Sequence, residues 1–292
     1  MSHPMCGRAI WLAVALALDS GSGAVAGSIT VAGNGPEVRM VEQLARSFEK
    51  RHLGSYVQVR WDPLSQPLDL IKSGEVDMAV AGHSDPDLAE IPLAWDGIAV
   101  VVDFTNPVKG VTRQELAGIF TRTVTRWSEL GGPDLEIQPI DRPPNQHIRQ
   151  SFEEGLGIAG LTSKSARMIR SDQRAISTVA GNVAAITYAS LSVVQEAVAY
   201  GVGVNLLMVD QVDPAEPTVK DGRYPLRRPV LLLTRKETNP AAAAFAAFAL
   251  SPEGQAIVDE MFVSPGGPDK PDASAGLAPQ LRPRGGVSIK TP

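Results

Sequence analysis

The sequence of 292 residues is poor in the residues that build disulfides and metal centres. Cys6 is its one cysteine, so the chain cannot form an internal disulfide or a metal site made of several thiolates. The four histidines are few and widely separated: His3, His52, His83 and His147. Although His83 and His147 could meet across a cleft, two such residues are a weak basis for a metal site. We therefore expect no disulfide and no bound metal.

Sequence motifs of common enzyme classes are also missing. No serine stands in a nucleophile-elbow pattern, and no glycine-rich phosphate loop precedes a Lys and Ser/Thr pair. Glu153 and Glu154 are neighbours on a predicted helix, so their side chains point about 100° apart and do not form a catalytic carboxylate pair. These observations predict a protein that is not an enzyme and that needs no cofactor.

Long apolar runs are absent as well. A transmembrane helix needs about 20 consecutive apolar residues, and no run in the sequence is that long. The shorter run at residues 10–18 follows Arg8 and precedes Ala24-Val25-Ala26, a cleavage pattern of small residues. This arrangement predicts a signal peptide at residues 1–26, which would take Cys6 with it when cleaved. The mature protein is then expected to be secreted.

Positive charge is not concentrated along the chain. Lysine and arginine number 27 against 32 acidic residues, which gives a net charge of -5, and the basic residues are scattered. Nucleic acid is therefore not an expected partner, whereas a small anion could still find a local positive pocket. The hydrophobic content of 43% is enough to bury a core.

Predicted strands alternate with predicted helices from residue 28 onward. Apolar-rich segments at 28–33, 57–61 and 76–81 predict strands, and the segments 38–48 and 68–73 predict helices between them. This alternation is typical of an α/β protein with a mostly parallel sheet and helices on both faces. In such sheets, ligands bind beyond the carboxyl ends of the strands.

Helix starts are marked by capping residues. Residues 98–102 form a continuous apolar run that predicts a strand buried on both faces. After it, Thr112 and Glu115 form a capping-box pattern ahead of a short helix. Near the end of the predicted fold, Asn239 followed by Pro240 predicts the start of a closing helix.

An arginine-bearing segment follows the predicted strand at residues 137–140. Arg142 stands at the end of this strand, and a helix that begins near Asn145 carries Arg149. An arginine beside a helix N-terminus is typical of an anion site, because the backbone N–H groups and the guanidinium both attract oxyanions. A salt bridge of Arg142 and an ion pair of Arg149 with Glu153 at i+4 are the structural alternatives.

Several segments together resemble one known family. They include Trp127-Ser128-Glu129-Leu130-Gly131-Gly132 and Ser251-Pro252-Glu253-Gly254. The full set lies, in order, at residues 92–102, 106–108, 116–121, 125–133, 179–182, 185–188, 222–229 and 247–255. These segments resemble the periplasmic phosphate-binding proteins of ABC transporters, which belong to the type 2 periplasmic binding protein superfamily. The resemblance extends roughly over residues 28–262.

The resemblance implies a bilobal fold in which two mixed sheets, flanked by helices, face each other across a ligand cleft. Domain I would be discontinuous, with residues 28–103 plus 207–262, and domain II would comprise residues 104–206. A hinge is expected near Val101 and Leu207. Residues 263–292 are rich in Pro and Gly without apolar periodicity, so a flexible C-terminal tail is predicted there.

The family also implies a function and a site. We expect a monomeric binding protein that takes a small anionic solute, such as phosphate, and delivers it to an ABC permease in the membrane. Three loops would converge on the cleft, and the predicted ligand-binding residues are Asn34, Gly35, His83, Ser84, Arg142, Asn145, His147 and Arg149.

Two of these loops depart from the family pattern. The family presents Ser and Thr hydroxyls after the first strand, where this chain has Asn34, Gly35 and Pro36. The third loop of the family carries a Gly-Ser-Gly-Thr run, whereas this chain has Pro143 and Pro144, which lack N–H donors. The ligand is therefore expected to be another acidic solute, or phosphate at reduced affinity. A non-transport sensor or interaction protein of the same fold is the alternative.

Overall fold

The structure is a computed structural model that describes residues 27–163 and 165–265. The predicted signal peptide at residues 1–26 lies outside the described residues, as does the part of the predicted tail from residue 266 onward. Of that tail, Val263 is described and buried, and it exchanges two backbone hydrogen bonds with Trp95.

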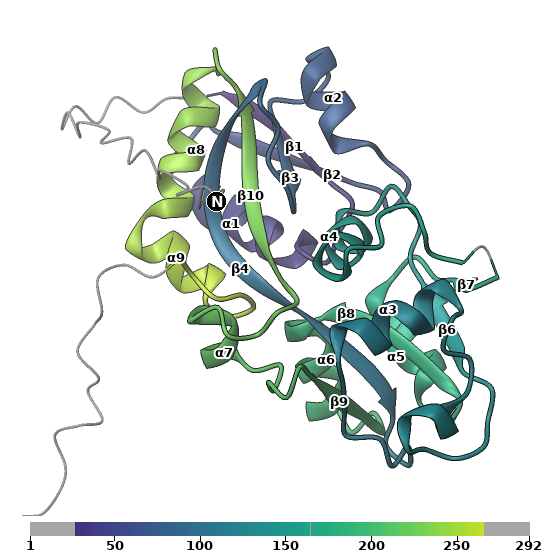
Figure 1. Cartoon of the computed structure of the whole chain (residues 1–292). Helices are drawn as coiled ribbons and strands as arrows, with labels where there is room; N and C mark the ends of the chain where they lie inside the picture. The colour runs from purple at the N-terminus through teal and green to yellow at the C-terminus, as the bar shows by residue number, and fades with distance from the viewer. Residues whose placement is uncertain (1–26, 164, 266–292) are drawn as a thin grey trace, which may run out of the picture.

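The described strands form a mixed sheet with the order β2-β1-β3-β10-β4-β8-β6-β7 (Figure 1). β1 pairs in parallel with β2 and β3, and β6 pairs in parallel with β7 and β8. The strand bounds on this path are β1 Ser28–Gly33, β2 Tyr56–Trp61, β3 Met78–Ala81, β4 Leu88–Asp103, β6 Gln138–Asp141, β7 Arg167–Met168, β8 Ala185–Ser190 and β10 Arg227–Arg235. The short strand β5 Gly110–Val111 pairs with β9 Val204–Val209, which also pairs with β4.

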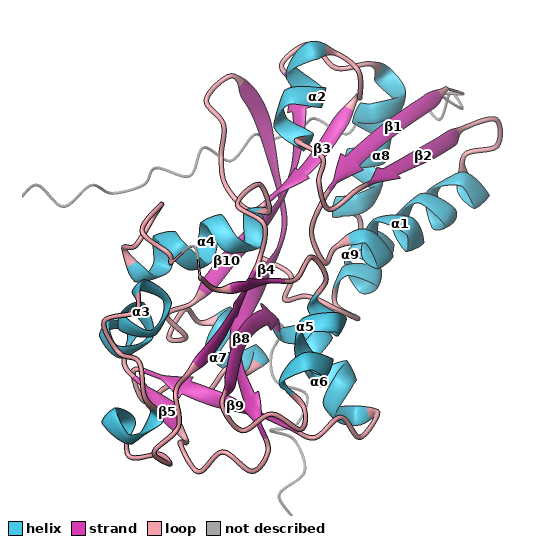
Figure 2. Cartoon of the chain, turned by 90° about the vertical axis from the view of Figure 1, so that its right-hand side faces the viewer, coloured by secondary structure: helices cyan, strands magenta, loops and turns pink. Residues whose placement is uncertain are grey.

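Two antiparallel strands, β4 and β10, join the upper and lower halves of the molecule (Figures 1 and 2). β4 has 16 residues and so extends for about 50 Å at the usual rise of a strand. Its first half pairs with β10, and its second half, which contains the predicted apolar run, pairs with β8 and β9. The run at residues 98–102 is fully buried, as the sequence predicts.

The helices cover the sheet in two groups. In the upper lobe, α1 Val38–Arg51, α8 Pro240–Leu250 and α9 Pro252–Val258 pack together, and α2 Pro67–Ser73 packs on β3 (Figure 2). The lower lobe contains α3 Arg113–Thr121, the 3-10 turn Trp127–Leu130, α4 His147–Leu156, α5 Asp172–Val179 and α6 Leu191–Ala199. The short helix α7 Glu216–Lys220 packs on β4.

The predicted helix caps are confirmed. Thr112 accepts a hydrogen bond from the Glu115 backbone at 3.1 Å, and the Glu115 carboxylate accepts one from the Thr112 backbone at 2.7 Å. Asn239 accepts from the Ala242 backbone at 2.7 Å, with Pro240 in the first turn. These contacts satisfy backbone donors that a helix N-terminus otherwise leaves free. Among the described residues, no single helix is long and apolar enough to cross a membrane; α8 and α9 meet that test only as a pair bent by 70°.

Buried apolar residues form separate cores in the two lobes. The lower core contains Ile98, Leu207 and Leu226, and the principal upper core contains Leu93 and Val230. The boundary between the two cores therefore lies between residues 94 and 98 on β4. On the second connection it lies between residue 226, just before β10, and residue 230 within β10. Val101 and Leu207, near which the hinge is expected, both lie inside the lower core, and the position of the hinge stays a prediction.

Candidate functional site

Three loops from the two lobes meet at one small pocket. The β1–α1 loop supplies Asn34, the loop after β3 supplies His83, and the β6–α4 segment supplies Asn145 and His147. The pocket has a volume of about 60 Å³ and is completed by Gln66, Pro67, Leu68, Ala81 and Gln150. Four of the eight predicted ligand-binding residues thus line one space between the lobes.

Backbone and amide contacts hold the lobes together beside this pocket. Asn34 donates to the Asn145 carbonyl at 2.9 Å, and Asn145 donates to the carbonyls of Pro63 and Ser65 at 3.1 Å each. These bonds join loops of opposite lobes across the cleft.

A cluster of ionisable residues, Glu37, Asp96, His147 and Arg228, lies between the lobes beside the pocket. Arg228 on β10 forms ion pairs with Glu37, and with Asp96 on β4 at 2.8 Å. Its Nη1 also donates to His147 Nδ1 at 2.8 Å. All four side chains are at most 4% exposed. Because an unpaired buried charge is very costly, each charged group in this interlobe cluster depends on the others.

The contact with Arg228 fixes the proton position on His147. A guanidinium can only donate, so His147 Nδ1 must accept, and the remaining proton of the neutral ring sits on Nε2. Nε2 faces Glu37 Oε2 at 3.3 Å. His147 of the lower lobe thus lies against both Arg228 and Glu37, which also pair directly with each other. With this tautomer, the interlobe cluster has two carboxylates and one positive charge.

The two carboxylates of the interlobe cluster titrate in opposite directions. Burial favours the protonated form of Glu37, but the charge of Arg228 and the contacts with Arg228 and His147 outweigh it and hold the pKa of Glu37 well below its usual range. For Asp96, burial and the nearby charge of Glu37 prevail over Arg228 and Ser190, and they raise its pKa to about 6. Asp96 is thus the member of the interlobe cluster that titrates near neutral pH.

Two glycines allow His147 to enter the space between the lobes. A Cβ atom at Gly35 would overlap Glu37 Oε2 and His147 Nε2. A Cβ atom at Gly82 would lie 3.0 Å from His147 Nδ1. The predicted ligand residue Gly35 therefore has a clear role in packing, because any side chain there would displace the contact of Glu37 with His147.

Arg142 is fully buried inside the lower lobe. It forms an ion pair with Asp172 at 3.1 Å, donates to Thr187 at 3.3 Å and to the Tyr188 carbonyl, and lies over the Tyr188 ring. Arg142 does not line the 60 Å³ pocket. Its predicted role in ligand binding stays a prediction, and the salt-bridge alternative describes the contacts present in the closed structure.

Arg149 is likewise engaged with neighbours of its own lobe. It forms ion pairs with Glu153 at 2.7 Å and Asp141 at 3.1 Å, and it donates to the Arg142 carbonyl at 2.7 Å and to Thr162. The i+4 pair considered from the sequence is therefore present. The predicted contact of Arg149 with a ligand stays a prediction.

Unsatisfied polar atoms point to what the pocket can bind. Buried Asn34 Oδ1 and His83 Nδ1 have no hydrogen-bond partner within the described structure. Burial lowers the pKa of His83, so the ring favours the neutral form. Both residues line the pocket, so these atoms are available to a bound solute or to water. Ser84 has a different environment, since it is exposed and donates to Glu90 at 2.9 Å.

Sequence reasoning missed the members of the interlobe cluster other than His147. Asp96 stands inside a segment of apolar residues, and Arg228 directly precedes the apolar part of β10. A charged residue inside a predicted buried strand is unusual, because its burial requires a partner. That signal indicates buried ion pairs, but it does not say which residues pair.

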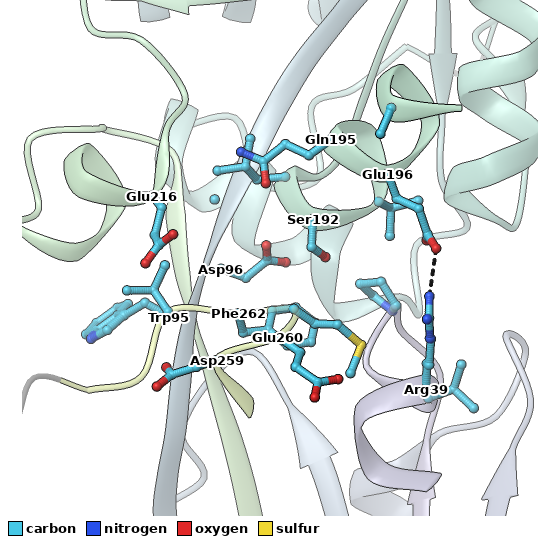
Figure 3. A pocket seen from close by; sticks show the side chains of 18 of the residues that line it. Arg39, Trp95, Asp96, Ser192, Gln195, Glu196, Glu216, Asp259, Glu260 and Phe262 are labelled. Carbon is cyan, nitrogen blue, oxygen red and sulfur yellow. Dashed lines mark hydrogen bonds and ion pairs between the residues drawn. The ribbon is translucent and has the colours of Figure 1, made fainter. Parts of the chain in front are cut away.

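A second cavity, of about 430 Å³, reaches Asp96 from the face formed by α1, α6 and the end of α9 (Figure 3). Arg39 of α1 and Glu196 of α6 form an ion pair of 2.7 Å across it (Figure 3). Its other charged side chains are acidic: Asp96, Glu216, Asp259 and Glu260. This lining disfavours an anionic ligand, so the cavity is a poorer anion site than the cleft pocket.

The fold and the interlobe cleft define a binding protein of two lobes joined by crossing strands. A family model described as a PBP superfamily domain matches residues 19–253, and the chain belongs to this superfamily of periplasmic binding proteins. The α/β bilobal fold predicted from the sequence is thereby confirmed.

Known relatives place the chain near the phosphate-binding members of this superfamily. It is 26% identical to the phosphate-binding protein PstS of Bacillus subtilis over 216 residues, which cover 68% of this chain and 67% of that protein. An ABC-type phosphate transport receptor from Vibrio cholerae has a TM-score of 0.71 and 26% identity, with 81% of this chain and all of that chain covered. A Clostridium perfringens protein, assigned as a phosphate ABC transporter substrate-binding protein and solved with phosphate bound, has a TM-score of 0.74 and 26% identity, covering 82% and 99%.

Proposed function

We propose that this protein is the substrate-binding component of an ABC transporter and that it binds phosphate or another small oxyanion or acidic solute between its lobes. The observation that carries this proposal is the meeting of Asn34, His83, Asn145 and His147 around one pocket in a fold shared with phosphate-binding receptors. We further propose that the protein acts in the periplasm as a monomer and hands its solute to a membrane permease.

A thermal-shift screen tests this function directly. The mature protein is heated with phosphate, sulfate, molybdate, phosphonates and small carboxylates in turn, because a ligand that binds only the folded state raises its melting temperature. Calorimetry then gives the affinity of each hit. The departures in the first and third loops predict that phosphate binds more weakly than micromolar, or that another anion is preferred. Submicromolar phosphate binding by the wild type would refute this change of specificity.

A second candidate function is a sensor or interaction protein of the same fold that has lost high-affinity anion binding. The contacts of His147 with Glu37 and Arg228 favour it, because they fill the cleft with the chain's own charged and polar groups. If the wild type binds none of the anions in the panel, this candidate is supported and transport of an anion is contradicted.

A further inference from the structure

We propose that Glu37 is a specificity-determining residue whose carboxylate occupies the place that an anionic solute would take against Arg228 and His147. An anion must then displace Glu37 before the lobes can close around it. This inference rests on the proposed function, since it assumes that the cleft is where a solute binds.

The geometry around Glu37 is that of a bound anion. Its Oε1 accepts from Arg228 Nη2, whereas its Oε2 lies 3.3 Å from His147 Nε2 without a hydrogen bond, so one oxygen has a donor and the other lies at ion-pair distance from the ring. Glu37 precedes α1 but makes no side-chain capping bond to that helix. Its side chain is therefore used between the lobes rather than at the helix end, where an acidic residue would usually be placed.

The buried charges around the cleft leave little attraction for an additional anion. Each of the three buried arginines near the cleft is already matched by carboxylates. The pairs are Arg228 with Glu37 and Asp96, Arg142 with Asp172, and Arg149 with Asp141 and Glu153. Three guanidiniums thus face five carboxylates. A dianion entering this region without displacing Glu37 would meet an excess of negative charge, which is strongly unfavourable away from water.

Removal of the Glu37 carboxylate should expose an anion site of carboxylate size. In Glu37→Ala, Arg228 keeps Asp96 but loses one of its two carboxylate partners, and the carboxylate oxygen 3.3 Å from His147 Nε2 is removed. A small free carboxylate such as formate can enter the space left and restore both contacts. Glu37→Gln serves as a size-matched control, because its amide fills the same space without a charge.

Chemical rescue by formate tests the inference. We expect Glu37→Ala to melt below the wild type, and about 100 mM formate to raise its melting temperature by about 3 °C or more relative to chloride at equal ionic strength. Wild type and Glu37→Gln should not respond. Glu42→Ala, in the helix that follows Glu37, is the control, because the Glu42 side chain is 45% exposed and its ion pair with Arg46 is 3.3 Å long. Equal responses of Glu37→Ala and Glu42→Ala would overturn the inference.

If Glu37→Ala is recovered unfolded, refolding yields with formate and with chloride are compared. Equal yields would likewise overturn the inference.

Phosphate calorimetry separates this inference from the proposed function. Phosphate binding that is at least about tenfold tighter in Glu37→Ala than in wild type supports both, since one competing charge has been removed. Formate rescue with no anion binding by the wild type or by either variant, beyond formate itself, contradicts the transport function and leaves the role of Glu37 standing. Equal phosphate affinity in wild type and Glu37→Ala overturns the role of Glu37 and leaves the function standing.

Discussion

At the scale of single residues, buried charges determine how the two lobes meet. Arg228 and His147 come from opposite sides of the cleft and share Glu37, although Glu37 and Arg228 are 191 positions apart in sequence. Such groups stabilise the closed form only as a complete set, because loss of one member leaves the others buried without a partner.

Asp96 should give the protein a pH dependence near neutrality. Its pKa is about 6 in the folded chain and near 3.8 when unfolded, so between about pH 4 and pH 6 the folded state holds a proton that the unfolded state has released. Stability contributed by this proton is present below pH 4 and falls as the pH rises through 6. Glu37 acts in the opposite sense, because its lowered pKa adds stability above about pH 4.5 that is lost in acid.

We expect urea midpoints of wild type to fall from pH 5 to pH 7, and Asp96→Asn to flatten this fall. An identical slope in the variant would show that another group titrates.

Arg142 should matter for stability before it matters for binding. Removing one partner of a buried ion pair costs about 3–5 kcal/mol, so Arg142→Ala should lower the free energy of unfolding by roughly that amount. Arg142→Lys should recover only part, because an ammonium cannot reproduce the planar contacts of a guanidinium. Arg46→Ala is the exposed control and should change stability by less than about 0.5 kcal/mol. Urea unfolding measures all three. Unchanged stability together with lost anion binding would instead make Arg142 a ligand contact.

At the scale of elements, local signals start the helices that cover each lobe. The capping box at α3 uses only residues three positions apart, so its contribution should be separable from tertiary packing.

Thr112→Ala should therefore destabilise the protein by about 1 kcal/mol, because the Glu115 N–H loses its acceptor at the helix start. Ser177→Ala is a suitable control, since Ser177 is exposed within α5 and bonds only back to the Gln173 carbonyl of its own helix. Urea unfolding of both variants measures the difference. Equal effects would indicate that the cap of α3 is dispensable.

At the scale of the whole molecule, β4 and β10 carry the chain between two separate cores. Contacts between the lobes lie on both sides of these strands, at Asn34 with Asn145 and at Arg39 with Glu196. Because these contacts join the lobes directly, we expect the wild type to be compact in solution.

Small-angle scattering tests the closed form. The wild-type profile without added anion should match the closed arrangement, and phosphate should change the radius of gyration little. Glu37→Ala should show a larger radius, because the charge that joins the two lobes is gone. A wild-type profile that matches only separated lobes would contradict the closed form, and a single globule without two lobes would contradict the architecture.

The sequence by itself determined the elements and the class of the fold. Apolar periodicity, the capping residues Thr112 and Asn239, and the alternation of strands and helices depend on neighbours in sequence, and they can be recognised without coordinates. Through the resemblance to a known family, the sequence also predicted that Asn34, His83, Asn145 and His147 lie in one cleft.

Only the tertiary structure decided which charges meet. Arg142 and Arg149 are prominent in the sequence, yet they pair with carboxylates of their own lobe, whereas Arg228 reaches the cleft. No local pattern links Glu37, Asp96 and Arg228, because their pairing depends on β4 and β10 lying side by side. Burial then makes that pairing obligatory, since a guanidinium removed from water requires a carboxylate within reach.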